Sequence, residues 1–215
     1  MSEEKAIREF CAENFENIPN AIEAGAGRIE LCDNLAEGGT TPSYGVIKQT
    51  ISFTQKKNVP TMVMIRPRGG NFEYDEIEVA IMKTDIEICQ NLNADGIVFG
   101  CLKNNWLDEK LIEALINQAK NMSVTFHMAF DELSIKNQFR AIDWLVDRGV
   151  DRILTHGGNA EKTITENTQH LLDLVAYADN RITILPGGGI HYGNVNQILN
   201  KLSLFEAHGT RIVSF

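Results

Sequence analysis

Short runs of β-branched and other apolar residues recur along the chain, and they alternate with longer segments whose apolar positions have helical spacing. We interpret eight of these runs as strands, and the helical segments between them favour a parallel sheet. No linker, low-complexity tract or shift in composition divides the chain, so we expect residues 1–215 to form one domain. The predicted strands are Ile7–Ala12, Arg28–Asp33, Pro60–Arg66, Gly96–Leu102, Ser123–Phe130, Arg152–His156, Arg181–Pro186 and Ser203–His208.

A weak internal repeat indicates how the sheet closes. Gly25–Ile29, Asn93–Ile97 and Gly149–Ile153 each end a helix with Gly or Asn, which accept a left-handed cap, and then enter the second, fourth or sixth strand. Recurrence at every second strand is typical of a closed barrel, so the sequence predicts a single TIM-type (β/α) barrel. An open doubly wound sheet is the alternative, but no Gly-x-Gly-x-x-Gly follows the first strand. Because the sequence ends at Phe215, soon after the eighth strand, we expect the final helix to be short or absent.

Composition narrows the range of partners. The chain has 29 acidic and 20 basic residues and a formal net charge of -9, which repels nucleic-acid phosphates and anionic membrane surfaces. No apolar stretch reaches the roughly 18 residues needed to cross a bilayer, and the first residues do not form an apolar signal segment. We therefore expect a cytoplasmic protein that binds neither nucleic acid nor membrane.

The four cysteines form no Cys-x-x-Cys pair, and a cytoplasmic setting keeps them reduced. Cys89 lies in a helical pattern and is interpreted as a small buried hydrophobic residue. Cys11, Cys32 and Cys101 lie on predicted strands.

Ionisable residues occur on the predicted inner face of several strands. Residues i and i+2 of a strand point to the same side, so Glu9 aligns with Cys11, Glu30 with Cys32, and Glu206 with His208. Charged groups inside a barrel are costly unless they are paired. We therefore predict a polar pocket at the C-terminal mouth of the barrel, and the alternative is a buried structural network that binds no ligand. The residues predicted to line this pocket, as candidate acids, bases and anion ligands, are Glu9, Glu30, Arg66, His127 and His208.

Glycine-rich turns follow two predicted strands. Gly187, Gly188 and Gly189 come after the seventh strand, where many barrels present backbone N–H groups to a phosphate. The alternative is a tight turn that needs positive φ. Arg68 lies in the other turn and is either a phosphate ligand or a solvated loop residue.

Three smaller features concern helix starts. Thr41 or Ser43 is expected to cap the helix after the second strand. Asp131 is expected to cap the helix after the fifth strand, and the alternative is that it orients His127. Met128 and Phe130 alternate with His127 and are expected to face the helices.

These motifs, taken together and in order, resemble the CutC family of copper homeostasis proteins over nearly the whole chain. The matching segments are 9–11, 28–32, 37–43, 64–70, 95–100, 126–131, 152–155 and 185–190. The resemblance implies a TIM barrel, a cytoplasmic location, a homo-oligomer (dimer or tetramer) and a part in copper handling in which Cys11 and Cys32 bind Cu(I). Three places depart from the family pattern. Met128 stands where members often have Arg, His156 stands where they often have Ser, and the strand-eight segment, commonly Phe-His-Ser, reads Glu-Ala-His-Gly over residues 206–209. The loss of that arginine weakens a phosphate role for its position.

Two functions follow as hypotheses. In the first, the chain is a metal-binding protein of copper homeostasis: Cys11 and Cys32 occupy equivalent places on adjacent strands, and Cu(I) prefers soft thiolates. In the second, it is an enzyme (isomerase, lyase or hydrolase) for a small phosphorylated or carboxylated metabolite. Glu30 or His127 would then move a proton and Arg66 would hold an anion. A barrel that serves only as a scaffold is a third reading, and the charged residues at the strand ends disfavour it.

Overall fold

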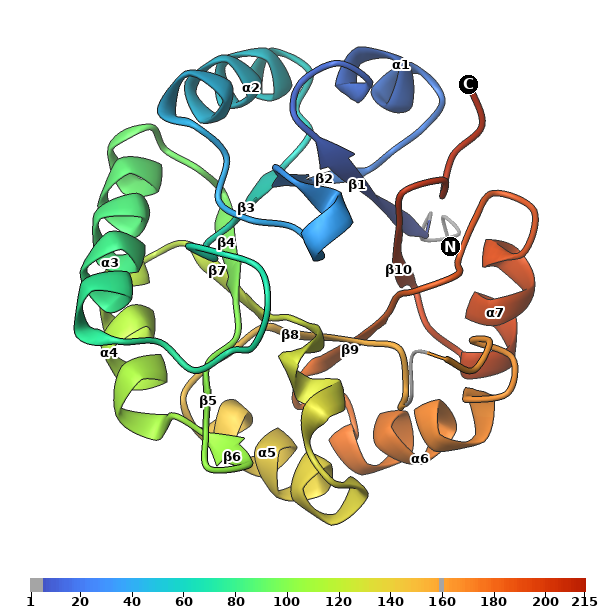
Figure 1. Cartoon of the computed structure of the whole chain (residues 1–215). Helices are drawn as coiled ribbons and strands as arrows, with labels where there is room; N and C mark the ends of the chain where they lie inside the picture. The colour runs from blue at the N-terminus through green and yellow to red at the C-terminus, as the bar shows by residue number, and fades with distance from the viewer. Residues whose placement is uncertain (1–5, 159–160) are drawn as a thin grey trace.

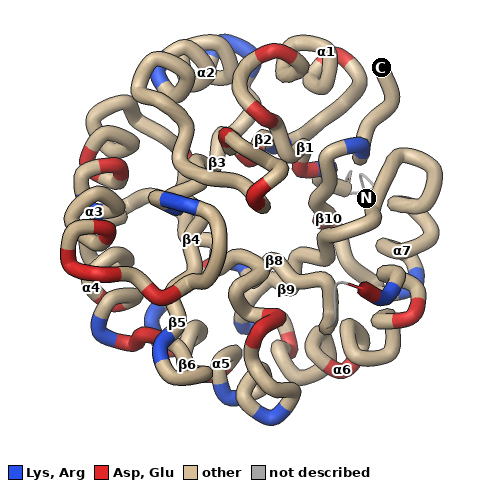
Figure 2. The backbone as a smooth tube through the Cα atoms, viewed as in Figure 1, with Lys and Arg blue, Asp and Glu red and all other residues tan. Residues whose placement is uncertain are grey.

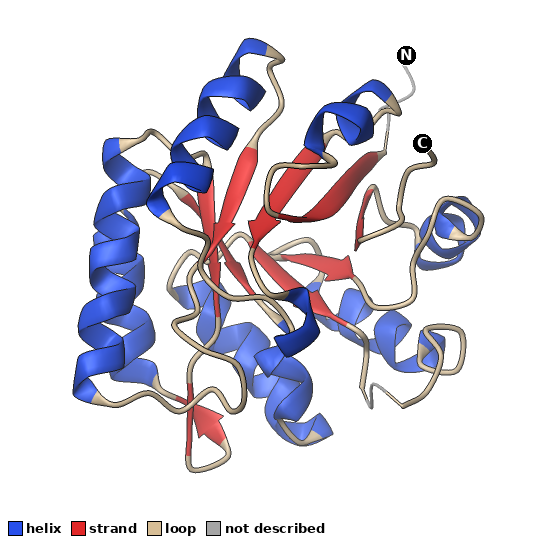
Figure 3. Ribbon diagram, turned by 45° about the horizontal axis from the view of Figure 1, so that its top comes forward, coloured by secondary structure: helices blue, strands red, loops and turns tan. Residues whose placement is uncertain are grey.

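Eight parallel strands form a nearly closed barrel with the helices packed outside it (Figures 1 and 3). The structure is a computed structural model, and it describes residues 6–158 and 161–215. The sheet order is β10-β1-β2-β3-β4-β7-β8-β9, which is the TIM-barrel order predicted from the sequence. The barrel strands are β1 Ile7–Glu13, β2 Arg28–Cys32, β3 Thr61–Met64, β4 Gly96–Phe99, β7 Ser123–Phe126, β8 Arg152–Thr155, β9 Thr183–Pro186 and β10 Glu206–Gly209.

The connecting helices surround the barrel as the helical patterns predict (Figure 1). Their bounds are α1 Ile18–Glu23, α2 Tyr44–Lys56, α3 Glu76–Asn91, α4 Glu109–Ala119, α5 Ile135–Asp147, α6 Thr168–Ala178 and α7 Val195–Leu202, with 3-10 turns η1 Leu35–Glu37 and η2 Met128–Glu132. A small hairpin, β5 Leu102–Lys103 and β6 Trp106–Leu107, was not expected from the sequence. No helix follows β10 in the described part of the chain, in agreement with the expected short or absent final helix.

Local sequence explains where the helices begin and end. Ser43 caps α2 by accepting a hydrogen bond from the Val46 N–H, so of the two expected caps Ser43 is the one used. The three repeat positions Gly25, Asn93 and Gly149 have φ of 97°, 58° and 71°, as the left-handed caps require. The predicted repeat therefore marks real helix-to-strand turns.

Two separate layers of apolar side chains stabilise the fold. The larger one lies between the strands and the helices and contains Phe99, Phe126, Ile29 and many other fully buried residues. The smaller one lies on the opposite face of the strands, inside the barrel, and consists of Cys11, Cys32, Met62, Met64 and Val98. The two-residue period of the strands divides them, because alternate residues face the two layers.

The barrel is not sealed by backbone hydrogen bonds all the way round. In the described residues, β9 and β10 form the two ends of the sheet order and do not pair with each other. A side-chain ion pair reaches past this seam, since Arg152 on β8 binds Glu206 on β10 with a distance of 3.0 Å from Nε to Oε2.

Three sequence expectations are corrected by the structure. The fifth strand ends at Phe126, so Met128 and Phe130 lie in η2 and not in a strand. Cys101 follows the end of β4 and is not part of it. Asp131 does not cap α5, whose cap is Ser134; its carboxylate instead accepts hydrogen bonds from the His156 N–H and the Thr155 hydroxyl of the loop after β8.

Charged residues are distributed mainly over the helices and loops around the barrel (Figure 2). Within the described residues, no helix combines the length and the apolar character that a membrane crossing needs.

Candidate functional site

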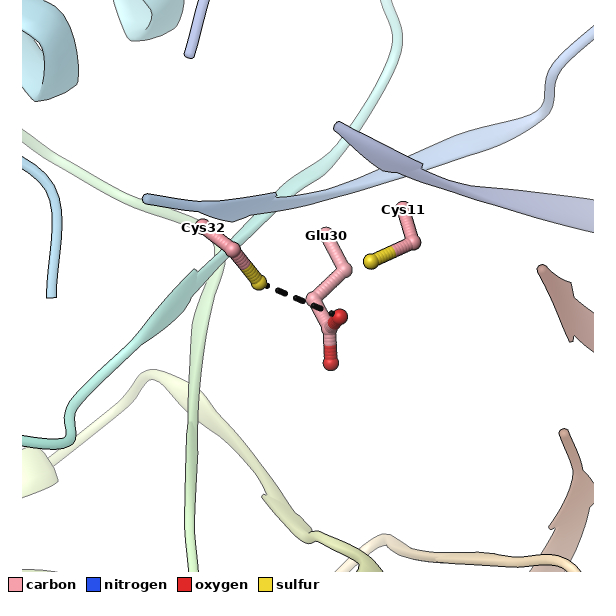
Figure 4. Close-up of side chains that lie close together, drawn as sticks. All are labelled: Cys11, Glu30 and Cys32. Carbon is pink, nitrogen blue, oxygen red and sulfur yellow. Dashed lines mark hydrogen bonds between the residues drawn. The ribbon is translucent and has the colours of Figure 1, made fainter. Parts of the chain in front are cut away.

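Two thiols and a carboxylate converge inside the barrel, in a space that we call the thiol chamber, defined by Cys11, Glu30 and Cys32. Cys11 lies on β1 and pairs in register with Glu30 on β2, and Cys32 lies two residues further along β2. Both sulfur atoms and a Glu30 carboxylate oxygen lie within 4.8 Å of one another, and all three side chains are buried. The Cys32 thiol donates to Glu30 Oε2 over 3.4 Å (Figure 4). This arrangement offers a small set of metal ligands on adjacent strands.

A chain of ion pairs continues from the thiol chamber towards the other end of the strands. His208 lies 3.6 Å from Glu30 and, through Nδ1, 2.8 Å from Glu9. Glu9 also binds Arg28, which is 2.6 Å from Glu206 on β10. The charges inside the barrel are therefore paired, as their burial requires.

The pairing determines the charge state of Glu9 and His208. Burial alone would raise the pKa of Glu9, but Arg28 and His208 together lower it to about 2. Burial alone would lower the pKa of His208, but Glu30, Cys11 and Glu9 raise it well above 6.5. Glu9 is thus an anion and His208 a cation at neutral pH.

The pKa values of Glu30 and of the two thiols shift in different directions, although the three groups share the same surroundings. Burial raises the pKa of Glu30 well above its usual value, and its Oε1 atom is buried without a hydrogen-bond partner. The hydrogen bond from Cys32 lowers the pKa of the Cys11 thiol well below 9, with a further contribution from His208, whereas the pKa of Cys32 is raised. Cys11 is therefore the thiol that ionises first.

Thioether sulfur and a folded loop complete the walls of the chamber. Met62 and Met64 of β3 belong to the same buried cluster as the two cysteines, inside the barrel. The loop of residues 33–42 covers this end, where Gly39 has φ of 89° and approaches so closely that a Cβ there would lie 3.3 Å from Cys32 Sγ. Leu35 of the same loop packs onto the chamber. Soft sulfur atoms and a bare backbone therefore surround Glu30.

The structure separates Arg66 from the ion-pair chain. Its guanidinium donates to the carbonyl groups of Glu37, Gly39 and Gly70 over 2.7–2.9 Å, and it lies over the Phe72 ring. Arg66 thus fastens the loop of residues 33–42 over the thiol chamber. The prediction that it joins the carboxylates in one pocket is corrected, because its two terminal nitrogens donate to loop carbonyls, while its buried Nε has no partner.

His127 is also apart from the cluster. It caps η2, where Nδ1 accepts from the Ala129 N–H at 3.1 Å, and its ring packs against Phe72. Burial and the charge of Arg66 lower the pKa of His127 to about 3, so the ring is neutral. Of the five residues predicted to line one pocket, Glu9, Glu30 and His208 lie together and the other two lie elsewhere.

The glycine turn after β9 borders a separate cavity of about 890 Å³. Gly188 and Gly189 line it together with Met128 and His156, the positions at which members of the family were expected to have Arg and Ser. Arg68 does not line this cavity: it binds Glu78 of α3 and the Glu73 carbonyl of its own loop. Its side chain is 39% exposed and is held in place by these contacts.

Sequence reasoning missed two of the cations inside the barrel. Arg28 lies two residues before Glu30, so the same alternation that aligned Glu30 with Cys32 places Arg28 on the inner face. Arg152, at the start of β8, binds both Glu206 and the Ser123 hydroxyl. The alternation was therefore sufficient to find Arg28, whereas the partners of Arg152 depend on strands far apart in the sequence.

Comparison with known proteins gives a consistent answer over the whole barrel. A model of the CutC family matches residues 6–213. A CutC family protein of Enterococcus faecalis is 57% identical over 208 residues, covering 96% of this chain and 100% of the relative. The copper homeostasis protein cutC homolog of Mus musculus is 39% identical over 203 residues, covering 94% of this chain and 72% of the relative.

Solved structures agree with the sequence comparison. The crystal structure of the copper homeostasis protein CutC of Streptococcus agalactiae has a TM-score of 0.94 and 45% identity, and the match covers 97% of this chain and 100% of that one. A deoxyribose phosphate aldolase of Aeropyrum pernix has a TM-score of 0.71 with 11% identity, over 96% of this chain and 85% of the aldolase, so it shares the fold alone. The matched family model, the identities and the fold all give one assignment: the chain belongs to the CutC family.

Proposed function

We propose that this protein binds Cu(I) in the thiol chamber, with the thiolates of Cys11 and Cys32 as ligands, as part of cellular copper handling. The observation that carries the proposal is the convergence of two sulfur atoms and a carboxylate oxygen within 4.8 Å of one another inside the barrel. Cu(I) is a soft ion that prefers thiolate and thioether ligands. Relatives named as copper homeostasis proteins support the same role.

The chemistry of the donors fits a monovalent soft ion. A metal-bound cysteine must give up its proton, and the lowered pKa of Cys11 makes that loss easier for the first ligand. Met62 and Met64 lie against the cysteines and supply thioether sulfur nearby. Glu30 places a carboxyl oxygen within 4.8 Å of both sulfur atoms, and a bound cation would favour the ionised form of this group.

Two features of the barrel would protect a bound Cu(I) ion. Cys11 and Cys32 are 6% and 0% exposed, so oxidants reach them poorly. The loop of residues 33–42, fastened by Arg66, limits exchange with solvent. The chamber is therefore suited to holding an ion and less suited to rapid turnover of a substrate.

Titration of the reduced protein with Cu(I) against a competing chelator tests the proposal. We expect one equivalent to bind, and the Cys11→Ser, Cys32→Ser double variant to lose at least about 100-fold in affinity because both soft ligands are removed. The matched control is the Cys89→Ser, Cys101→Ser double variant, which removes two equally buried thiols outside the chamber and should keep the wild-type affinity. Equal affinities of the chamber variant and the wild type would refute the assigned site.

The cytoplasmic location and the homo-oligomeric state remain predictions from the sequence and the resemblance. Cell fractionation tests the first, and the mass of the protein in solution tests the second. A reducing cytoplasm is what the thiol chemistry requires, since oxidised cysteines do not bind Cu(I) as thiolates.

A further inference from the structure

The largest cavity described for this protein lies at the barrel mouth beside η2 and is separate from the thiol chamber. Its volume is about 890 Å³, and neither Cys11 nor Cys32 lines it. Cavities of this size hold small metabolites. The walls come from Phe72 of the loop after β3, from η2, from described residues of the loop after β8 and from the turn after β9, so four connections of the barrel contribute to one space.

Two backbone N–H groups without partners belong to residues that line this cavity. Gly188 and Gly189 have φ of 78° and 77°, and their N–H groups form no hydrogen bond within the described residues. Gly188 cannot carry a side chain here, because a Cβ would lie 2.6 Å from His156 Nδ1. The turn therefore brings bare backbone and two unused donors to the wall of the cavity, where a bound anion can approach closely.

One unpaired cation lines the same cavity. Lys162 is exposed and makes no ion pair within 4.0 Å in the described part of the chain. Of the acidic residues that line the cavity, Asp131 is bound by the Thr155 hydroxyl and the His156 and Gly158 N–H groups, which leaves Glu132 exposed. Lys162 thus has no ion-pair partner at contact distance in the described residues, although it attracts Glu166 at longer range, and the Asp131 carboxylate already accepts three hydrogen bonds.

Apolar side chains line the remaining wall. Phe72, Met128 and the buried Ile164 border the cavity next to the polar groups. A ligand that fits must combine a charged group with a carbon skeleton, as small organic phosphates do. Inorganic ions alone would leave this wall without contacts.

From these features we propose that the cavity is a binding site for a small organic phosphate. The phosphate group accepts from the N–H groups of Gly188 and Gly189 and from the Lys162 ammonium, and the carbon skeleton lies against Phe72, Met128 and Ile164. A phosphate offers several acceptor oxygens, which suits two backbone donors and one ammonium group. The site does not depend on copper binding, because it shares no residue with the thiol chamber.

Backbone amide chemical shifts, followed during titration of the full-length protein at constant ionic strength, test this site. The probes are glycerol 3-phosphate, inorganic phosphate, glycerol and chloride. We expect saturable shifts at Gly188 and Gly189 with glycerol 3-phosphate, weaker binding of inorganic phosphate, and no saturation with glycerol or chloride. Shifts that saturate equally with chloride, or that appear elsewhere and leave both glycines unchanged, would overturn the proposal.

A pair of lysine variants separates this site from general charge effects. Lys162→Ala should weaken the binding of glycerol 3-phosphate by about five- to tenfold, because one charge-assisted hydrogen bond is lost. Lys201→Ala removes an equally exposed lysine from α7, outside the cavity, and should change the affinity by less than about twofold. Equal losses in the two variants would show that the phosphate binds through the overall field and not at this site.

Discussion

The inside of the barrel and the layer between strands and helices are both buried and both contain apolar side chains, yet they differ in the charged groups that they hold. The outer layer is a continuous apolar core in which Cys89 is one small side chain among many. The inside holds sulfur, carboxylates, guanidinium groups and an imidazolium in contact with one another. Burial raises the pKa of Cys89 to about 12, whereas a neighbouring thiol lowers the pKa of Cys11. Burial alone therefore does not determine the reactivity of a cysteine; its polar neighbours do.

The largest effect should come from removing one charge inside the barrel. Glu9→Gln leaves Arg28 and His208 buried with a neutral partner, so we expect the free energy of unfolding to fall by about 3–5 kcal/mol. Glu113→Gln is the matched control on the outside, where the carboxylate also binds an arginine Nε, and should change it by about 1 kcal/mol or less. Urea denaturation at pH 7 measures the free energy of unfolding of both variants. Similar decreases in the two would mean that the ion pairs inside the barrel stabilise the protein no more than a surface ion pair does.

His127, which is buried and neutral in the folded protein, should make the free energy of unfolding depend on pH. The pKa of His127 is about 3 in the folded protein and near 6.5 when unfolded, so the unfolded state gains protons first as pH falls. The contribution of His127 to the free energy of unfolding is fully present above pH 6.5. It decreases at lower pH, by about 2 kcal/mol between pH 7 and pH 5.

The matched pair for this test is His127→Gln and His191→Gln, since both histidines accept a backbone N–H through Nδ1. The difference between wild-type and His127→Gln unfolding energies should shrink as pH falls from 7 to 5, and His191→Gln should keep the wild-type slope. A His127→Gln slope equal to that of the wild type would contradict a buried neutral ring.

Alkylation rates compare the two classes of cysteine directly. At pH 7 a small electrophile such as iodoacetamide should modify Cys11 more than about tenfold faster than Cys89 or Cys101, because only Cys11 has a lowered pKa. Mass spectrometry of digested peptides gives the three rates. Faster labelling of Cys89 or Cys101 would mean that access, and not ionisation, controls the thiols.

A smaller change is expected when the cover of the thiol chamber is loosened. Arg66→Met removes three hydrogen bonds to loop carbonyls while keeping a long side chain, so alkylation of Cys32 should become about fivefold faster. Arg68→Met breaks a comparable set of loop contacts away from the chamber and should leave that rate unchanged. Identical rates in the two variants would show that the loop does not limit access.

The smallest effect concerns the thioether groups. Met64→Leu should lower the affinity for Cu(I) by about threefold, since it removes a soft sulfur beside the cysteines at nearly constant volume. Met82→Leu makes the same exchange in the outer layer, where the side chain is fully buried, and should not alter copper affinity. Titration with Cu(I) against a chelator measures the affinity of each variant. Equal affinities would mean that the Met64 thioether is not a ligand and that the thiols alone bind the ion.

The strands and the interior charges could be predicted because the two-residue period holds for as long as a strand lasts. Glu9, Glu30 and His208 lie within strands, and the alternation placed them on the same face. Arg66 and His127 follow the ends of β3 and β7, where the period no longer fixes direction. A long guanidinium at such a position bonds to whichever carbonyls the loops supply, and loop paths depend on tertiary contacts that the sequence pattern does not contain.

The unpaired seam between β9 and β10 affects how the barrel responds to strain. A cylinder whose backbone ladder is complete can widen only by breaking hydrogen bonds, but here the ladder between β9 and β10 is missing within the described chain, and only beyond the strand ends does the Tyr192 N–H donate to the Arg211 carbonyl. The ion pair of Arg152 and Glu206 connects β8 to β10 across this gap through side chains alone. A change in the diameter of the barrel, such as one caused by filling its interior, can therefore be accommodated by movement of side chains between β9 and β10. The other seven strand-to-strand pairings keep their register.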